Sequence, residues 1–296
     1  MITQSTDLIE TDVLIIGTGV AGCTTALTLA DAGVAVTVVT RGRAPQDSNT
    51  YWAQGGIIYQ GANDSPELLA ADVERAGAGH CYPKAVQILA EQGPASVRRV
   101  LLERTAVAFD RSQTGDLSLA LEGGHTIPRI IHAADATGKA IEIALLNALR
   151  AHPNITLLTG HTAIDLLTPS YQGRNRLLVY EPRNCVGAYL LDQERGQVIR
   201  CLARKTVLAT GGLDKIFLRT TNPAGRAAMA WRWPIGPACT RSTPSLCNST
   251  QPLFMRATVP AFSCRRLCGG PVRGLCTPTA NLLWTNTRRS GRFGPA

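Results

Sequence analysis

Long apolar runs are missing from this sequence. A membrane-spanning helix needs about 18 consecutive apolar residues, and no run in the chain is that long. The N-terminal segment MITQSTDLIETD also lacks the basic stretch followed by an apolar stretch that marks a secretory signal. The 296-residue chain is nevertheless 45% hydrophobic, which is enough for a sizeable core. We therefore expect a cytoplasmic globular protein of one large or two ordinary domains, with no membrane partner.

Acidic residues, lysine and histidine are absent from the C-terminal part of the chain. Residues 232–296 hold nine arginines, five cysteines and eight of the 17 prolines, whereas residues 1–231 balance 21 basic against 21 acidic side chains. The net charge of +9 therefore comes entirely from this tail, and it does not indicate a nucleic-acid partner for the rest of the chain. Because Pro, Arg and Ser interrupt every apolar run of the tail, we expect it to be disordered.

Metal-binding cysteine patterns are also lacking. The four cysteines before residue 232 contain no C-x-x-C pair, so neither a zinc site nor a redox disulfide is expected in a reducing cytoplasm. The tail carries Cys264, Cys268 and Cys276 among arginines, but the spacing C-x3-C-x7-C without histidine is poor for zinc. The sequence therefore predicts no metal.

The front of the chain has the pattern of a dinucleotide-binding βαβ unit. An apolar run at 13–16 breaks at GTGVAG, a helix of small residues follows as far as Gly33, and residues 35–40 form a second buried strand. In such a unit the glycines allow a tight turn, close approach of backbone amides to a pyrophosphate, and helix-on-strand packing. In this cofactor loop Gly17 is predicted to make the turn, Gly22 to allow the helix to pack on the strand, and Thr18, Gly19, Val20 and Ala21 to contact the diphosphate. Thr40 and Arg41 stand where an NAD site carries an acid, which disfavours NAD and leaves NADP open.

Further helices and strands follow. Ser65-Pro66 predicts a helix start, and residues 138–150 carry an apolar helical stripe that Pro153 ends. The segments ITLLTGHTAIDLL, RLLVYE, CVGAYLLD and VIRCLARKTVLATGG are predicted strands. The fold class is therefore α/β.

Several motifs together resemble one protein family. The βαβ unit and the segments NTYWAQGGI (49–57), HAADATGKAI (132–141), HPNITLL (152–158), VLATGGL (207–213) and TTNPAG (220–225) resemble the flavoproteins related to succinate dehydrogenase and fumarate reductase, and among them the L-aspartate oxidases. The resemblance covers about residues 10–231. It implies a Rossmann-like FAD-binding domain over 1–231, with a doubly wound parallel sheet and an added β-meander, and no capping or helical domain.

The same resemblance implies a reaction. The L-aspartate oxidases oxidise L-aspartate to iminoaspartate as the first step of NAD biosynthesis. Their electron acceptor is oxygen or fumarate, and quinolinate synthase is a partner. Because the capping domain and the family's catalytic arginine are not found, we expect this chain to be an inactive fragment. A soluble fumarate reductase and a non-catalytic FAD-binding fragment are the alternatives.

Site residues follow from the resemblance as well. Asn49 occupies the place of the histidine that links FAD covalently in membrane-bound relatives, so the FAD should be noncovalent. The resemblance places the ribose at Arg41, the adenine at the backbone of Ala163 and Ile164, and the flavin ring at Asn49, Thr50, Tyr51, Trp52, Ala53, Gln54, Gly55 and Gly56.

The motif EGGH implies substrate contacts. Glu122 is the family's substrate-orienting glutamate, whose carboxylate would pair with the substrate ammonium; a solvated loop glutamate is the alternative. His125 is a second catalytic candidate, although a lone histidine is more often a hydrogen-bonded structural residue.

Beyond Arg232 the resemblance stops, and it returns in another reading frame. Codons can be chosen that encode PSLCNSTQPL (244–253) and that, when translation starts at the third base of each codon, encode Glu-Phe-Val-Gln-Phe-His-Pro-Thr-Ala. This second sequence is the substrate-loop motif of the L-aspartate oxidases. The same offset turns AFSCRRLCGG (261–270) into Leu-Phe-Leu-Ser-Glu-Ala-Val-Arg-Gly. We therefore interpret residues 232–296 as out-of-frame translation.

Overall fold

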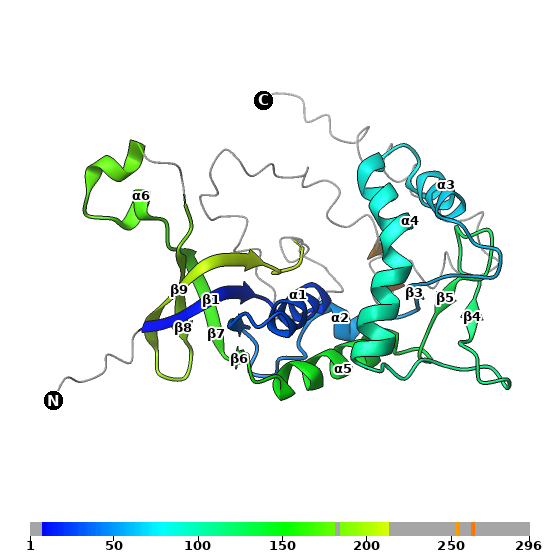
Figure 1. The fold of residues 1–296 in the computed structure, drawn as a ribbon, viewed down its shortest axis with the longest axis horizontal. Helices are drawn as coiled ribbons and strands as arrows, with labels where there is room; N and C mark the ends of the chain where they lie inside the picture. The colour runs from blue at the N-terminus through cyan, green and yellow to red at the C-terminus, as the bar shows by residue number, and fades with distance from the viewer. Residues whose placement is uncertain (1–7, 181–183, 213–252, 255–261, 264–296) are drawn as a thin grey trace, which may run out of the picture. The chain divides into compact units, whose positions relative to one another are not determined.

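The computed structural model describes residues 8–180, 184–212, 253–254 and 262–263 (Figure 1). It divides into two compact units. The first comprises Met1–Ile57, Ala95–Ser118 and Ile131–Cys247, and the second comprises Ile58–Pro94, Leu119–Ile130 and Asn248–Ala296, each as far as described. The predicted boundary at residue 232 and nearly all of the predicted tail lie outside the described residues; within that tail, β10 (Leu253–Phe254) pairs antiparallel with β11 (Phe262–Ser263).

The first unit is built on a six-stranded mixed sheet of order β6-β2-β1-β9-β8-β7. Its strands are β1 (Leu8–Ile16), β2 (Val36–Val39), β6 (Ile155–Leu158), β7 (His161–Leu166), β8 (Gly187–Asp192) and β9 (Gln197–Leu208). Neighbours from β6 to β9 are parallel, whereas β9, β8 and β7 form an antiparallel meander. The prediction of a Rossmann-like sheet with an added β-meander is therefore confirmed.

The order of the parallel strands identifies where a ligand binds in such a sheet. The chain runs from β1 through helix α1 (Val20–Asp31) to β2, and later through α5 (Thr137–Ala151) to β6 on the same side. It then places β9 on the opposite side of β1. In open α/β sheets the crevice at such a reversal, outside the carboxyl ends of the strands, is the usual ligand site. Here that crevice lies after Ile16 and Leu208, which are register partners.

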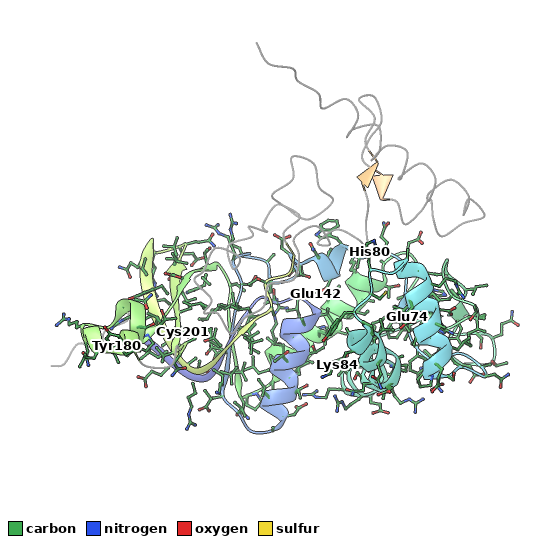
Figure 2. All side chains as sticks on the ribbon, turned by 90° about the horizontal axis from the view of Figure 1, so that it is seen from above. Glu74, His80, Lys84, Glu142, Tyr180 and Cys201 are labelled. Atoms are coloured by element: carbon green, nitrogen blue, oxygen red, sulfur yellow. The ribbon has the colours of Figure 1, made fainter. Side chains whose placement is uncertain are left out.

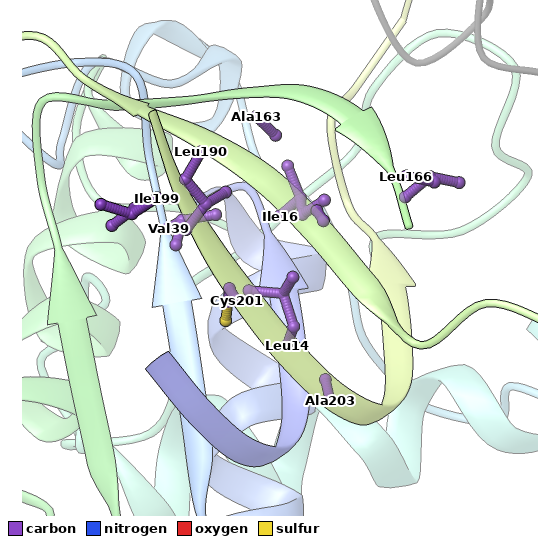
Figure 3. Packing of buried hydrophobic residues seen from close by; sticks show 10 residues of the cluster. Leu14, Ile16, Val39, Ala163, Leu166, Leu190, Ile199, Cys201 and Ala203 are labelled. Carbon is purple, nitrogen blue, oxygen red and sulfur yellow. The ribbon is translucent and has the colours of Figure 1, made fainter. Parts of the chain in front are cut away.

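A core cluster joins the meander to the parallel strands (Figure 3). Leu14, Ile16 and Val39 contribute from the parallel strands, and Ala163, Leu166, Ala188, Leu190, Ile199, Cys201 and Ala203 from the meander. Fully burying one such aliphatic side chain stabilises the fold by about 1.5–3 kcal/mol. Burial also raises the pKa of the Cys201 thiol to about 11, so this residue packs as a small neutral side chain.

Helix α5 of the first unit buries a narrow apolar stripe. In α5, Ile141, Leu145 and Leu149 recur every four residues and are all buried, and the helix ends before Pro153 as predicted. Glu142 of the same helix is fully buried, and Figure 2 labels it together with Cys201 of β9. The apolar stripe explains why this segment is helical.

The second unit carries α3 (Pro66–Gly77) and most of α4 (Pro83–Val97), which continues into the π-helix η1 (Arg98–Arg104) of the first unit. The Ser65 hydroxyl accepts a hydrogen bond from the Leu68 N–H at 3.2 Å, with Pro66 in the first turn. This confirms the predicted helix start. The short strands β3 (Ile57–Ile58), β4 (Leu119–Ala120) and β5 (Ile130–Ile131) form a sheet of order β3-β5-β4.

One local prediction is wrong, and one helix was not predicted. The segment RLLVYE forms the 3-10 helix η2 (Arg176–Tyr180), after the short helix α6 (Pro169–Gln172), and not a strand. The Asn175 side-chain oxygen accepts from the Leu177 N–H at 3.0 Å, a local hydrogen bond that competes with strand pairing. The segment NTYW, for which the sequence predicted no secondary structure, is the short helix α2 (Asn49–Trp52), because the Ser48 hydroxyl caps it by accepting from the Tyr51 N–H.

No helix within the described ranges combines the length and the apolarity needed to cross a bilayer.

Candidate functional site

The glycine loop after β1 lies at the strand reversal. Gly17 has φ of 119°, a conformation that side-chain-bearing residues rarely adopt. A Cβ on Gly17 would overlap the carbonyl oxygen of Ala209, which follows β9, and a Cβ on Gly22 would overlap the carbonyl oxygen of Gly17. Neither position therefore has room for a side chain. This agrees with the roles predicted for Gly17 in the turn and for Gly22 in the packing of the helix on the strand.

The N-terminus of α1 follows this loop. Its N-cap, Gly19, is extended at φ −68° and ψ −179°, no side chain caps it, and the first turn holds no acidic residue. Val20 and Ala21 are exposed there, so solvent reaches the first turn. The aligned peptide dipoles place a partial positive charge of roughly +0.5 at such an end. An uncapped helix start after a glycine turn is suited to a phosphate.

The buried side chains of Thr18 and Cys23 stabilise the loop through hydrogen bonds to backbone carbonyls. The Thr18 hydroxyl donates to the Pro45 carbonyl at 2.8 Å, and the Cys23 thiol donates to the Thr18 carbonyl at 3.0 Å. Burial, and secondly the nearby Glu142 carboxylate, raise the pKa of the Cys23 thiol. A thiol that keeps its proton can serve as this donor throughout the ordinary pH range.

Helix α2 lies beside the start of α1. The Val20 N–H donates to the Thr50 hydroxyl at 3.0 Å, which joins two predicted contact groups that are 30 residues apart. Gly138 of α5 allows this packing, because a Cβ there would overlap the Thr50 carbonyl oxygen. The Asn49 Oδ1 atom is buried and accepts no hydrogen bond from the described residues. A buried acceptor of this kind fits a ligand that offers an N–H or O–H group.

The remaining flavin-ring residues follow α2. Tyr51 contacts Trp52 edge-to-face with ring centroids 5.4 Å apart, and Trp52 is 61% exposed. The Ala53 carbonyl accepts from the Gly138 N–H at 3.1 Å, and Gly55 has φ of 77°. Gln54 is exposed and Gly56 is half-buried. The segment therefore turns at Gly55 immediately after its anchor on α5.

Arg41, predicted to contact the ribose, follows β2 beside the start of β7, the strand that carries Ala163 and Ile164. The His161 N–H, at the start of β7, donates to the Thr40 carbonyl at 3.0 Å, and Gln193 donates to the Arg41 carbonyl at 2.9 Å. Ala163 is buried in the core, whereas Ile164 is 36% exposed. The β7–β8 register is irregular between Ala163 and Asp165, so the ladder is interrupted at Ile164.

One cavity of about 460 Å³ is lined mainly by residues of α1 and of the junction between α4 and η1. Its walls are mainly apolar and include Leu29, Ile57 and Val100. Of the predicted site residues it contains only Val20, so it is not the crevice at the strand reversal.

In the second unit the EGGH loop is anchored to α3. The His125 N–H donates to the Glu122 carbonyl at 3.2 Å, which closes the turn. Asp72 accepts from the N–H and the hydroxyl of Thr126 at 2.9 and 3.0 Å. Arg75 pairs with Asp72 and donates to the Gly124 carbonyl at 3.1 Å. The loop that carries Glu122 and His125 is therefore bonded to α3 at Gly124 and Thr126.

Arg129 is the centre of a buried charged cluster. Its side chain is fully buried, and its Nε donates to Asp64 at 2.9 Å. Its Nη1 donates to Asp72 at 2.7 Å and to the His125 Nδ1 at 3.1 Å. Burial alone would raise the pKa of Asp72, but hydrogen bonds from Thr126, Arg129 and Arg75 outweigh it and lower the pKa to about 2.

Asp64, Asp72 and Arg129 were not identified from the sequence. A signal was present, since Asp72 lies on the same helical face of α3 as the buried Leu69, a position where an ionised side chain requires a partner. Arg129 directly precedes the buried pair Ile130 and Ile131.

Three other histidines, His132, His152 and His161, have structural partners. The His132 Nδ1 lies 3.0 Å from Asp110, the His152 Nε2 lies 3.2 Å from Asp31, and the His161 Nδ1 lies 2.6 Å from the Thr159 carbonyl oxygen. In the described part of the chain, no group of three His, Cys, Asp or Glu side chains is arranged to hold a metal ion.

Comparison with known proteins places this geometry in context. Residues 12–240 match the model of the FAD binding domain family. L-aspartate oxidase 1 of Ralstonia nicotianae is 43% identical over 228 residues, and L-aspartate oxidase of Pseudomonas aeruginosa is 40% identical over 233 residues. Each alignment covers 75% of this chain but 41% of the relative, so the chain spans about two fifths of the length of these curated relatives.

A solved structure agrees with this. Mycobacterium smegmatis Sdh1 in complex with UQ1 superposes with a TM-score of 0.64 and 27% identity, over 74% of this chain and 37% of that chain. The resemblance predicted from the sequence motifs is confirmed.

Proposed function

Because the chain belongs to the FAD binding domain family, we propose that its first unit holds FAD at the crevice between β1 and β9. The observation that carries this proposal is the glycine loop, where the positions of Gly17 and Gly22 have no room for a side chain and where the following helix starts at Gly19, an N-cap residue without a side chain. The amides of Gly19 and Ala21 would contact the diphosphate, and the Val20 N–H, which donates to the Thr50 hydroxyl, would hold the loop beside it. FAD, when bound, supplies the acceptor for a hydride.

The other predicted contacts complete the proposed site. Arg41 follows β2 and would contact the ribose, and the irregular ladder at Ile164 supports the backbone of Ala163 and Ile164 as the adenine contact. The buried Asn49 Oδ1 supports the segment 49–56 as the flavin contact, since the flavin ring carries an N–H donor.

We further propose that the intact protein oxidises L-aspartate to iminoaspartate, the first step of NAD biosynthesis, and passes the electrons to oxygen or fumarate. The support is that the relatives cited above are L-aspartate oxidases and that the second unit holds the EGGH loop rigidly. Glu122 would pair with the substrate ammonium. Quinolinate synthase would be the partner that uses the product. That residues 1–296 do not turn over aspartate by themselves stays a prediction.

The attachment of FAD gives the first test. Because Asn49 cannot form the covalent link that a histidine forms, denaturing the holoprotein is expected to release all the flavin. Absorbance of the filtrate and of the protein pellet after acid precipitation measures this. Flavin that stays with the polypeptide would contradict the assignment of Asn49.

The role of Glu122 gives a second test. In protein expressed with the reading frame restored near codon 232, Glu122→Gln is expected to weaken the use of L-aspartate by about 1–3 kcal/mol, the cost of a lost charge-assisted contact, with unchanged FAD content. Steady-state peroxide production gives kcat/KM. The matched control is Glu74→Gln on the exposed face of α3 (Figure 2), which should leave kcat/KM unchanged. Equal kinetics for both variants would make Glu122 a solvated loop residue.

A further inference from the structure

The contact between Arg129 and His125 determines which ring nitrogen of His125 carries the proton. The Arg129 Nη1 and the His125 Nδ1 are 3.1 Å apart. A guanidinium offers only N–H donors and keeps its charge at every pH that a folded protein tolerates. The His125 Nδ1 must therefore be the acceptor, and a neutral His125 ring carries its proton on Nε2.

Arg129 cannot turn away from this contact. Its side chain is fully buried, and two buried carboxylates, Asp64 and Asp72, accept from its Nε and Nη1. Asp72 also anchors the EGGH loop through Thr126. The same cluster therefore fixes both the backbone of the loop and the orientation of the imidazole.

The charges around His125 act in opposite directions. Burial, and secondly the positive charge of Arg129, lower the pKa of His125, while the carboxylates of Asp72, Glu122 and Asp64 work against this. The net shift is downward, so the ring is neutral at pH 7.

We propose that Arg129 is a positioning residue that fixes His125 as a neutral imidazole with its proton on Nε2, so that His125 offers the substrate a hydrogen-bond donor and not a base. The turn that joins Glu122 to His125 places a carboxylate and a neutral N–H donor in one loop. These two groups match the ammonium and the α-carboxylate of an amino acid, which lie on one carbon. This assignment of the substrate rests on the proposed function; the positioning role of Arg129 does not.

The test is histidine NMR on the full 296-residue chain with ¹⁵N-labelled histidine. His125→Gln assigns the His125 signals. At neutral pH, His125 is expected to show an unprotonated Nδ1 and a protonated Nε2. His132 in the same spectrum is an internal control with the opposite expectation, because its Nδ1 lies 3.0 Å from the Asp110 carboxylate, which can only accept. A His125 that carries its proton on Nδ1, or that is cationic at pH 7, overturns the proposal.

Two variants separate positioning from general stability. Arg129→Lys removes the planar fork that reaches His125 and both carboxylates, and is expected to mix the His125 tautomers. Asp64→Asn perturbs the same cluster but leaves the Nη1–Nδ1 contact, so it should keep the Nε2–H form. A folded Arg129→Lys protein with an unchanged His125 tautomer overturns the role of Arg129. If that variant does not fold, the wild-type and Asp64→Asn spectra decide.

Substrate addition separates this inference from the proposed function. L-aspartate added to the holoprotein with the reading frame restored is expected to shift the His125 Nε2–H resonance. If His125 carries its proton on Nε2 but its resonance does not change when L-aspartate is added, the role of Arg129 is supported and the substrate assignment is overturned. If His125 carries its proton on Nδ1 and its resonance does change, the role of Arg129 is overturned and the substrate assignment is supported.

Discussion

Replacing Gly17 by alanine is expected to abolish FAD binding and to destabilise the first unit by on the order of 3 kcal/mol or more. The new Cβ would overlap the Ala209 carbonyl oxygen, and the backbone at φ of 119° disfavours any side chain. The clash is not easily relieved, since the Ala209 N–H donates to the Ile16 carbonyl at 2.9 Å and holds the end of β9 against β1. Flavin content and urea-induced unfolding measure the two effects.

Gly33→Ala is the matched control. Gly33 also has positive φ, at 82°, but nothing lies within 4 Å of a Cβ built there. In this variant the free energy of unfolding should fall by only about 1 kcal/mol, the cost of placing alanine at positive φ, and FAD should stay bound. If the Gly17 variant bound FAD as the control does, the crevice between β1 and β9 would not be the cofactor site.

Replacing Arg129 by methionine is expected to lower the free energy of unfolding by about 3–5 kcal/mol, because Asp64 and Asp72 would stay buried without their shared cation. The control is Arg204→Met, whose side chain is 83% exposed and pairs with Asp12 at 3.4 Å. Removing that surface pair should change stability by less than about 1 kcal/mol. Urea unfolding monitored by circular dichroism distinguishes the two outcomes.

The cost of the Arg129 change should depend on pH. Asp72 has a folded-state pKa of about 2, below the ordinary value of 3.8, so its contribution to stability is present above the ordinary value and is lost as pH falls towards 2. A protonated Asp72 needs no cation. The difference in stability between the wild type and Arg129→Met is therefore expected to narrow as pH falls from about 5 to about 2. A difference that stays constant over this range would show that Arg129 acts through packing and not through its charge.

Short-range patterns in the sequence were sufficient to identify much of the fold. The contact of Gly22 with Gly17, the cap at Ser65 and the apolar stripe of α5 each depend on residues only a few positions apart, so the sequence predicted them correctly. The described segment 176–180 was predicted wrongly, because its apolar content is compatible with either a strand or a helix, and the hydrogen bond to the Asn175 side chain favoured the helix.

The partners of these segments were decided only by the tertiary structure. Gly17 meets Ala209 because β9 returns beside β1, and Val20 meets Thr50 because α5 holds α2 in place through Gly138. The cluster around Arg129 joins residues up to 65 positions apart. A sequence pattern shows which side chains are apolar and how often they recur, and so determined the βαβ unit and its glycine turn. Whether a charged side chain is buried depends on which distant segments surround it, and that was decided by the packing of the folded chain.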